Sequence, residues 1–135
     1  MTKKLWKTML TGMMSQSGDL PPWTIGEWRK HKGKLTMCEA GLHASENVID
    51  AFSYVVPGMF CEVEVRGKHR AQEDKQVWSE MRVLRAWEWT KEDSVSLAVY
   101  AAELVIGIYE KKYPGDGRPR KAIEAAKAWL KDPSE

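Results

Sequence analysis

The hydrophobic pattern of the chain changes its period at Thr90, and this change limits the folds that are open to it. Before that point apolar and polar residues alternate, most clearly from Met59 to Arg66, as in a strand with one buried face. After it apolar residues recur at helical spacing, and Thr90 with Asp93 resembles a capping box in which Asp replaces the usual Glu. The sequence therefore predicts an α+β fold, with an antiparallel β-rich N-terminal two-thirds that includes a short helix, followed by a C-terminal antiparallel helical hairpin.

The β-rich portion, residues 1–89, is expected to contain four strands and the short helix. The strands are predicted at residues 1–10, 34–38, 59–66 and 76–87, and the last two should be antiparallel neighbours. Residues 39–41 are interpreted as a turn and Ser45 as the N-cap of a helix that reaches Val55. A long irregular loop is expected at residues 11–32, where glycines and prolines interrupt every periodic pattern.

The helical hairpin is predicted over residues 90–131. The segment 113–117, which contains a proline and two glycines, should end the first helix, and Pro119 suits the first turn of the second. A connection this short makes the two helices antiparallel. Because 135 residues is an ordinary domain size, residues 1–135 are expected to form a single domain around one core.

Composition excludes several classes of protein. Hydrophobic residues make up 43% and charged residues 30% of the chain, which is typical of a globular protein rather than a disordered or membrane protein. The basic N-terminus lacks the apolar run of a signal peptide, so we expect a cytoplasmic location and no membrane partner. Cys38 and Cys61 match no metal-binding spacing and are expected to be buried free thiols, without metal or cofactor.

The charge distribution points to an anion near the N-terminus. The net charge is only +2, but lysines and arginines greatly outnumber acidic residues in the first quarter of the chain. That quarter also contains three of the seven tryptophans, a residue that often lines grooves and interfaces. Trp28 is accordingly a candidate ligand-binding residue.

His43 is the most suggestive single residue. It is expected in a turn just before a helix N-terminus, where backbone N–H groups favour an anion. The alternative is a structural histidine that bonds to nearby backbone. His31 and His69 are interpreted as solvated.

Arg118, Arg120 and Lys121 form a second candidate ligand-binding group. Guanidinium groups at a helix N-terminus oppose the helix dipole, which favours an anion or phosphate between them. The alternative is pairing with Asp116, Glu110 or Glu124.

No catalytic constellation is recognised in the sequence. Glu62 and Glu64 share one strand face and would perturb each other's pKa, although a solvated face explains them equally well. Nucleophile elbow, phosphate-loop, dinucleotide and zinc-protease motifs are absent from the sequence. A non-enzymatic protein is therefore expected, with no catalytic residue assigned.

Two stretches together resemble uncharacterised small proteins of phages and prophages. They are the CEAGLHAS turn at residues 38–45, accompanied by VEVRG at 63–67, and the YEKKYP segment at 109–114 that leads into RPRKAIEAA at 118–126. The C-terminal stretch also resembles the helical part of putative bacterial immunity proteins. The resemblance implies a non-enzymatic accessory or counter-defence protein that binds a host defence protein or a small nucleotide signal. A phage-encoded chain of this kind is expected in the host cytoplasm.

A second resemblance is to ADP-ribosyltransferase folds, in which a Gly-aromatic turn precedes a short helix, as Gly41 to Ser45 precedes Ala51 to Tyr54 here. It implies, as the alternative, an enzyme acting on NAD or ADP-ribose with His43 or Glu64 in the site. Leu42 and His43 replace the expected aromatic residue. A nucleic-acid-binding module that uses Lys30, Lys32, Lys34 and Arg118 is the third hypothesis. A homodimer through the broad apolar stripe of residues 95–109 is a separate prediction.

Overall fold

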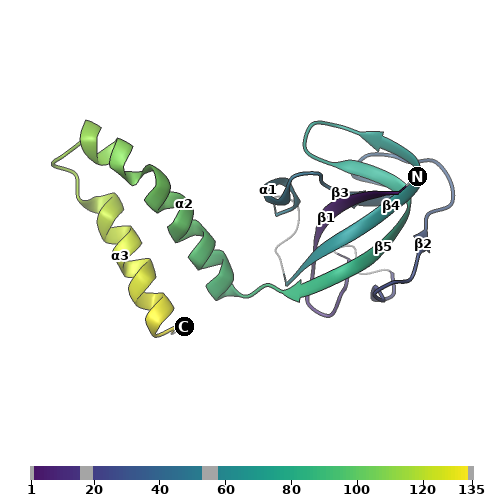
Figure 1. The fold of residues 1–135 in the computed structure, drawn as a ribbon, viewed down its shortest axis with the longest axis horizontal. Coiled ribbons are helices and arrows are strands. Elements are labelled where there is room, and N and C mark those ends of the chain that lie inside the picture. Colours follow the sequence, from purple (N-terminus) through teal and green to yellow (C-terminus); the bar gives the residue numbers. More distant parts are fainter. Residues whose placement is uncertain (1, 16–19, 53–57, 134–135) are drawn as a thin grey trace. The chain divides into compact units, whose positions relative to one another are not determined.

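The computed structural model describes residues 2–15, 20–52 and 58–133. Its chain divides into two compact units, Met1–Trp89 and Thr90–Glu135, and each is described by itself. The fold is α+β, with an antiparallel five-stranded sheet in the first unit and two helices in the second (Figure 1). The change of period at Thr90 therefore marks a real boundary, and the fold class is confirmed. Each unit has its own cluster of buried apolar residues, and the single-domain expectation stays a prediction.

The sheet is built around two long neighbouring strands, β4 (Met59–Ala71) and β5 (Gln76–Glu88). They pair antiparallel, as expected, and both extend beyond the predicted ends. β1 (Lys3–Met9) pairs with the other edge of β4. β2 (Arg29–Lys30) and β3 (Leu42–Ala44) pair with the remaining edge of β5.

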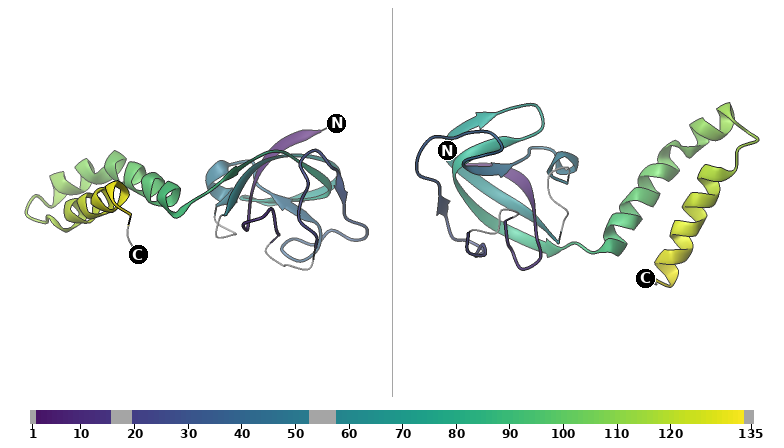
Figure 2. Two further views of the ribbon diagram at one scale, coloured as in Figure 1. Left: turned by 90° about the horizontal axis from the view of Figure 1, so that it is seen from below. Right: turned by 180° about the vertical axis from the view of Figure 1, so that it is seen from behind.

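The sheet curls until its two ends meet. Trp6 of β1 and Ser45, which directly follows β3, exchange backbone hydrogen bonds of 2.8 and 2.9 Å. The strands β1, β4, β5 and β3 are therefore joined in a circuit, as in a small barrel, and the curvature is visible in Figure 2. The contact places β3 and the turn before it next to β1.

The two faces of the sheet differ in chemistry, as the alternation predicts. Inward-facing residues pair across the strands, with Leu5 opposite Val63 and Val65 opposite Met81, and all four are fully buried. The outer face carries opposite charges in register: Glu62 with Arg85, Glu64 with Arg82 and Arg66 with Glu80. Cross-strand pairs of this kind stabilise a sheet modestly, so the carboxylates have a structural role here.

The predictions of a strand at 34–38 and of a turn at His43 are wrong. The expected strand at 34–38 is a tight turn in which Thr36 bridges Ala40 and Cys38 has a φ of 68°. The strand forms instead at Leu42–Ala44, because Leu42 and Ala44 can then enter the core beside β5. His43 thus lies within a strand and not in a turn.

The short helix begins later than expected. α1 spans Val48–Ala51, and its N-cap is Asn47, whose side chain accepts a 3.0 Å hydrogen bond from the Ile49 N–H. Ser45 is not a cap because its backbone is bonded to Trp6. The predicted end at Val55 lies outside the described residues.

The loop predicted at 11–32 is largely irregular in its described part, but it is tied to the sheet, where the Gly26 N–H donates a 2.8 Å hydrogen bond to the Val83 carbonyl. Trp23 is buried in the core, and its backbone N–H donates a 2.9 Å hydrogen bond to the Met13 carbonyl of the same loop. The short strand β2 then pairs with β5.

The second unit is the expected antiparallel hairpin of α2 (Lys91–Lys112) and α3 (Arg118–Lys131), seen side by side in Figures 1 and 2. The Thr90–Asp93 capping box is present, and Pro119 lies in the first turn of α3. Val99, Ile106 and Ile123 are buried between the helices. Neither of these helices, nor any other in the described part of the chain, is long and apolar enough to cross a membrane.

Candidate functional site

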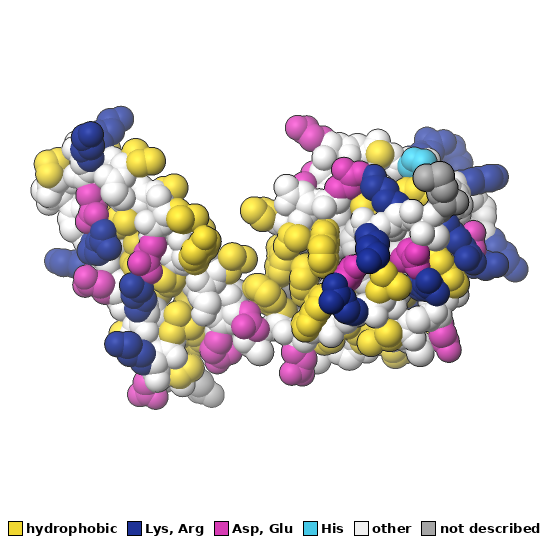
Figure 3. Space-filling view, viewed as in Figure 1, with side chains coloured by type: hydrophobic (Ala, Val, Ile, Leu, Met, Phe, Trp, Pro, Cys, Tyr) yellow, Lys and Arg dark blue, Asp and Glu magenta, His cyan; other side chains and the backbone are white. Residues whose placement is uncertain are grey.

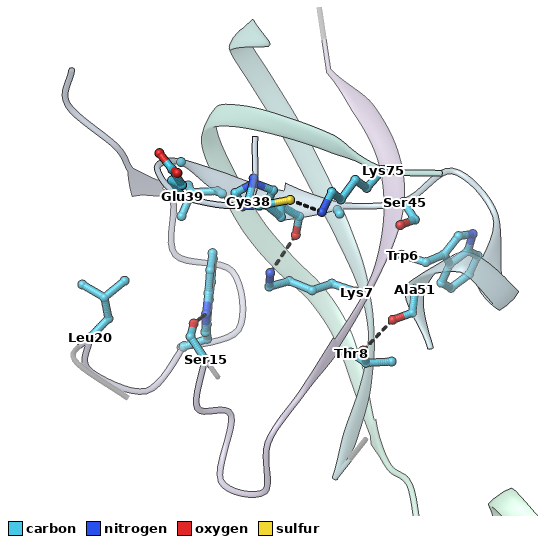
Figure 4. A pocket seen from close by; sticks show the side chains of 15 residues that line it. Trp6, Lys7, Thr8, Ser15, Leu20, Cys38, Glu39, Ser45, Ala51 and Lys75 are labelled. Atoms are coloured by element: carbon cyan, nitrogen blue, oxygen red, sulfur yellow. Dashed lines mark hydrogen bonds between the residues drawn. The ribbon is translucent and has the colours of Figure 1, made fainter. Parts of the chain in front are cut away.

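A pocket of about 540 Å³ lies where β1 meets β3. Its walls come from Trp6 to Thr8 of β1, from residues 41–45 around β3, and from Trp23 in the loop. Figure 4 shows these side chains around the cavity. Because three segments distant in sequence meet here, only the closure of the sheet creates the pocket.

Lys7 lies at the centre of this arrangement. It occupies an inward position of β1, between the fully buried Leu5 and Met9, and its Nζ donates a 2.7 Å hydrogen bond to the His43 carbonyl (Figure 4). Desolvation lowers the pKa of this amine to about 8; nearby Cys61 opposes the shift and Arg29 adds to it. A pKa near 8 leaves the amine mostly protonated at neutral pH.

The charge of Lys7 has no carboxylate partner among the residues that the structure describes. The groups that shift its pKa are burial, a thiol and another cation, and Glu39, the one carboxylate among the pocket residues, is not one of them. A buried cation without a counter-ion is costly. An anion bound in the pocket would compensate the positive charge of Lys7.

A second amine lines the same cavity. Lys75 is buried, and its Nζ lies 2.5 Å from the Sγ of Cys38 (Figure 4). Cys38 is exposed on its tight turn, so the expectation of a buried thiol is wrong for Cys38. It is correct for Cys61, where burial raises the pKa of the thiol to about 11.

His43 has a structural bond at this pocket. Its Nε2 accepts a 2.9 Å hydrogen bond from the Cys38 N–H, so its side chain closes the turn that precedes its own strand. Desolvation, then the charges of Lys7 and Lys75, lower its pKa to about 4. The ring is therefore neutral at physiological pH, and its accepting nitrogen is occupied. This matches the structural alternative considered for His43.

Trp23 supplies a flat apolar wall to the pocket. Its Nε1 donates a 3.0 Å hydrogen bond to the Ser15 hydroxyl, and the Arg29 guanidinium lies 4.0 Å from the centre of its ring. Because only 4% of Trp23 is exposed, the indole supports the wall of the pocket from the core side and leaves no polar group unsatisfied.

Trp28 does not line this pocket. It lies with its ring near two guanidinium groups, 3.8 Å from Arg66 and 4.8 Å from Arg82. Both arginines are also paired with carboxylates, Arg66 with Glu80 and Arg82 with Glu64. Trp28 and His43, both predicted to bind the ligand, therefore occupy different surroundings.

Arg118, Arg120 and Lys121 belong to the helical unit. Arg118 forms hydrogen bonds with Asp116 through its backbone and its guanidinium, which holds the pKa of that carboxyl well below its usual range. Arg120 pairs with Glu110 at 2.6 Å. Lys121 is exposed on α3. Both guanidinium groups thus have the carboxylate partners that the alternative interpretation named.

Two other titratable residues, Glu62 and His69, are held by contacts with neighbouring side chains. Glu62 bonds to Arg85, and this hydrogen bond lowers its pKa. His69 stacks on Trp78 with ring centres 4.1 Å apart. No cluster of three or more metal-binding side chains occurs in residues 2–15, 20–52 and 58–133.

Sequence reasoning missed Lys7 as a site residue. The signal was present, because Lys7 interrupts the inward-facing series Leu5, Met9 with a charged side chain. A lysine at a core position of an amphipathic strand indicates a cavity or a functional group.

Comparison with known families identifies the β-rich unit. The family model described as "Domain of unknown function (DUF7666)" matches residues 3–94, a range that ends within the first turn of α2. Searches of curated proteins and of solved structures returned no match. Because the match covers more than half of the 135 residues, the chain belongs to the DUF7666 family, whose domain has no assigned function.

Proposed function

We propose that the β-rich unit binds a small anionic ligand of the nucleotide type in the pocket between β1 and β3, without reacting with it. The observation that carries this proposal is the Lys7 amine, which lines the cavity and has no carboxylate partner in the described part of the chain. A phosphate would provide the missing negative charge, with Lys75 as a second cation at the same cavity.

The dimensions and lining of the pocket support a nucleotide rather than a bare inorganic anion. Its volume of about 540 Å³ falls in the range of small-molecule sites. Its lining is partly apolar, and Trp23, which is only 4% exposed, forms a rigid wall on the core side.

The proposal keeps the biological setting expected from sequence, a cytoplasmic accessory or counter-defence protein of phage type. Capture of a small nucleotide signal is the branch of that hypothesis that the pocket supports. Binding of a host defence protein remains the other branch, and the described contacts supply no argument for it.

The enzymatic alternative has weaker support. Glu64 lies on the outer face of the sheet, paired with Arg82 at 2.5 Å, whereas the ring nitrogen of His43 is bonded to Cys38. The two residues suspected of ADP-ribosyl chemistry are thus not joined in one pocket. Incubation with NAD should release no nicotinamide; release that is lost in His43→Ala would favour the enzyme.

Binding is tested by thermal shift and calorimetry with inorganic phosphate, AMP, ADP-ribose and a cyclic dinucleotide. We expect at least one nucleotide to stabilise the full chain, by roughly 2.7 kcal/mol at a hundredfold excess over Kd. Lys7→Met should abolish the effect. Lys32→Met, which removes an exposed lysine of the same unit, should retain it.

The pH dependence gives an independent check. Because the pKa of Lys7 is about 8, binding of the anion should weaken as the pH rises from 7 to 9. Absence of any shift with the whole panel, or equal binding by Lys7→Met, would refute the proposal.

A further inference from the structure

Helix α2 has two apolar faces on opposite sides. One face packs against α3 and includes the buried Val99 and Ile106. The other face, here called the outer stripe, is exposed by 47–74% and consists of Leu97, Tyr100, Leu104, Val105 and Ile108. None of the described residues 90–133 of the helical unit covers it, and Figure 3 shows apolar side chains along this helix.

The regular spacing of the residues in the outer stripe distinguishes them from apolar residues that are scattered singly over a protein surface. Leu97, Leu104 and Ile108 recur at intervals of seven and four residues, so they project from one side of the helix through three turns. A continuous exposed stripe of large side chains marks an interaction surface.

We propose that the outer stripe binds the same stripe of a second copy, with the two α2 helices antiparallel. A two-fold axis beside residues 102–103 places Leu97 opposite Ile108 of the second copy. The same axis brings Tyr100 to Leu104. The stripe is thus complementary to itself when its direction is reversed, which is the requirement for a two-fold symmetric interface.

The charges at the two ends of the stripe favour the antiparallel direction. Asp93 is exposed at the N-terminal end of α2, and Lys111 and Lys112 are exposed at the C-terminal end. The two-fold axis brings Asp93 of each copy next to Lys111 of the other. A parallel pair would instead place the lysines of both copies together and the aspartates together.

The product would be a row of four helices, with the two α2 helices in the middle and one α3 helix on each outer side, because α3 and the second copy contact opposite faces of α2. The proposal does not depend on ligand binding by the β-rich unit.

The first experiment measures the mass of the full chain by light scattering over a hundredfold range of concentration. We expect twice the chain mass of 15.4 kDa at high concentration. Leu104→Glu should weaken the dimer at least about 100-fold, because it places an unpaired charge in the interface. Ala125→Glu, the same kind of change at an exposed position of α3, should leave the dimer intact, and circular dichroism should show both variants helical.

The second experiment tests the direction of the helices in chains that carry Cys38→Ser. Mixing Leu97→Cys chains with Ile108→Cys chains under oxidation should give mainly the mixed disulfide. Predominance of the Leu97→Cys homodisulfide would overturn the antiparallel arrangement. A concentration-independent monomer, including one whose stripe is covered by its own β-rich unit, would overturn the dimer.

Discussion

The side-chain amine of Lys7 donates its 2.7 Å hydrogen bond to the main-chain carbonyl of His43, and the side chain of His43 in turn accepts from the Cys38 N–H. These two bonds link β1, β3 and the turn before β3. Lys7 therefore both holds the pocket closed on one side and places a positive charge inside it.

Lys7→Met is expected to raise the free energy of unfolding near pH 7 because it removes a desolvated cation. In the wild type the amine loses its proton at about pH 8 when folded and at about 10.5 when unfolded. The unfolded state thus binds more protons between these values, and stability should rise with pH from about 8 to 10.5. Urea unfolding across this range should show the rise in the wild type and a flatter profile in the variant; an equal rise in both would contradict the assignment.

His43 should make the protein more stable as the pH rises from about 4 to 6.5. Its folded pKa of about 4 lies below its ordinary value of 6.5, so the unfolded state binds the extra proton in this window. His43→Gln removes the titration while keeping an acceptor for Cys38, and its unfolding free energy should vary less between pH 5 and 6.5. His43→Ala should also lose about 1 kcal/mol at pH 7 through the missing hydrogen bond.

Gly41→Ala should destabilise the β-rich unit strongly. Gly41 has a φ of 120°, and an added Cβ would lie 2.3 Å from the Val77 Cγ2 and 2.9 Å from the Leu35 Cδ2. The backbone strain alone is worth about 1–3 kcal/mol, and the contact adds to it. Gly115→Ala is the matched control, because an added Cβ there meets no atom within 4 Å. Thermal unfolding should separate the two variants; similar melting temperatures would show that β3 can shift away from β5.

Phe60→Ala should lower the free energy of unfolding by about 3 kcal/mol. The Phe60 ring stacks with Trp6 and Trp87, at centroid distances of 5.3 and 5.7 Å, and also contacts the rings of Phe52 and Trp89. Its removal therefore breaks four aromatic contacts and exposes apolar surface. Ile25→Ala, at a side chain that is 56% exposed, is the control and should change stability little. Urea unfolding followed by tryptophan fluorescence measures both; a loss below 1 kcal/mol for Phe60→Ala would mean that the stack is not structural.

The accuracy of the sequence predictions differed between regular and irregular segments. The strands at 59–66 and 76–87 and both long helices were identified because each has a repeating pattern of several turns or pleats. The strand at 42–44 was missed because three residues cannot show a period, and the pattern at 34–38 was equally short. Arg118 and Arg120 were predicted to bind a ligand, and the structure pairs them with Asp116 and Glu110, two of the carboxylates named in the alternative interpretation.

The long strands and helices, and the boundary between them at Thr90, follow from the order of apolar residues, because strand and helix periods are local properties of each segment. The pocket depends on how distant segments come together in the folded chain. Lys7, His43 and Lys75 are separated by more than thirty residues from one another, and they line one cavity only because the bridge between Trp6 and Ser45 closes the sheet. A contact of that kind depends on the curvature of all the strands together, which no single segment of the sequence encodes.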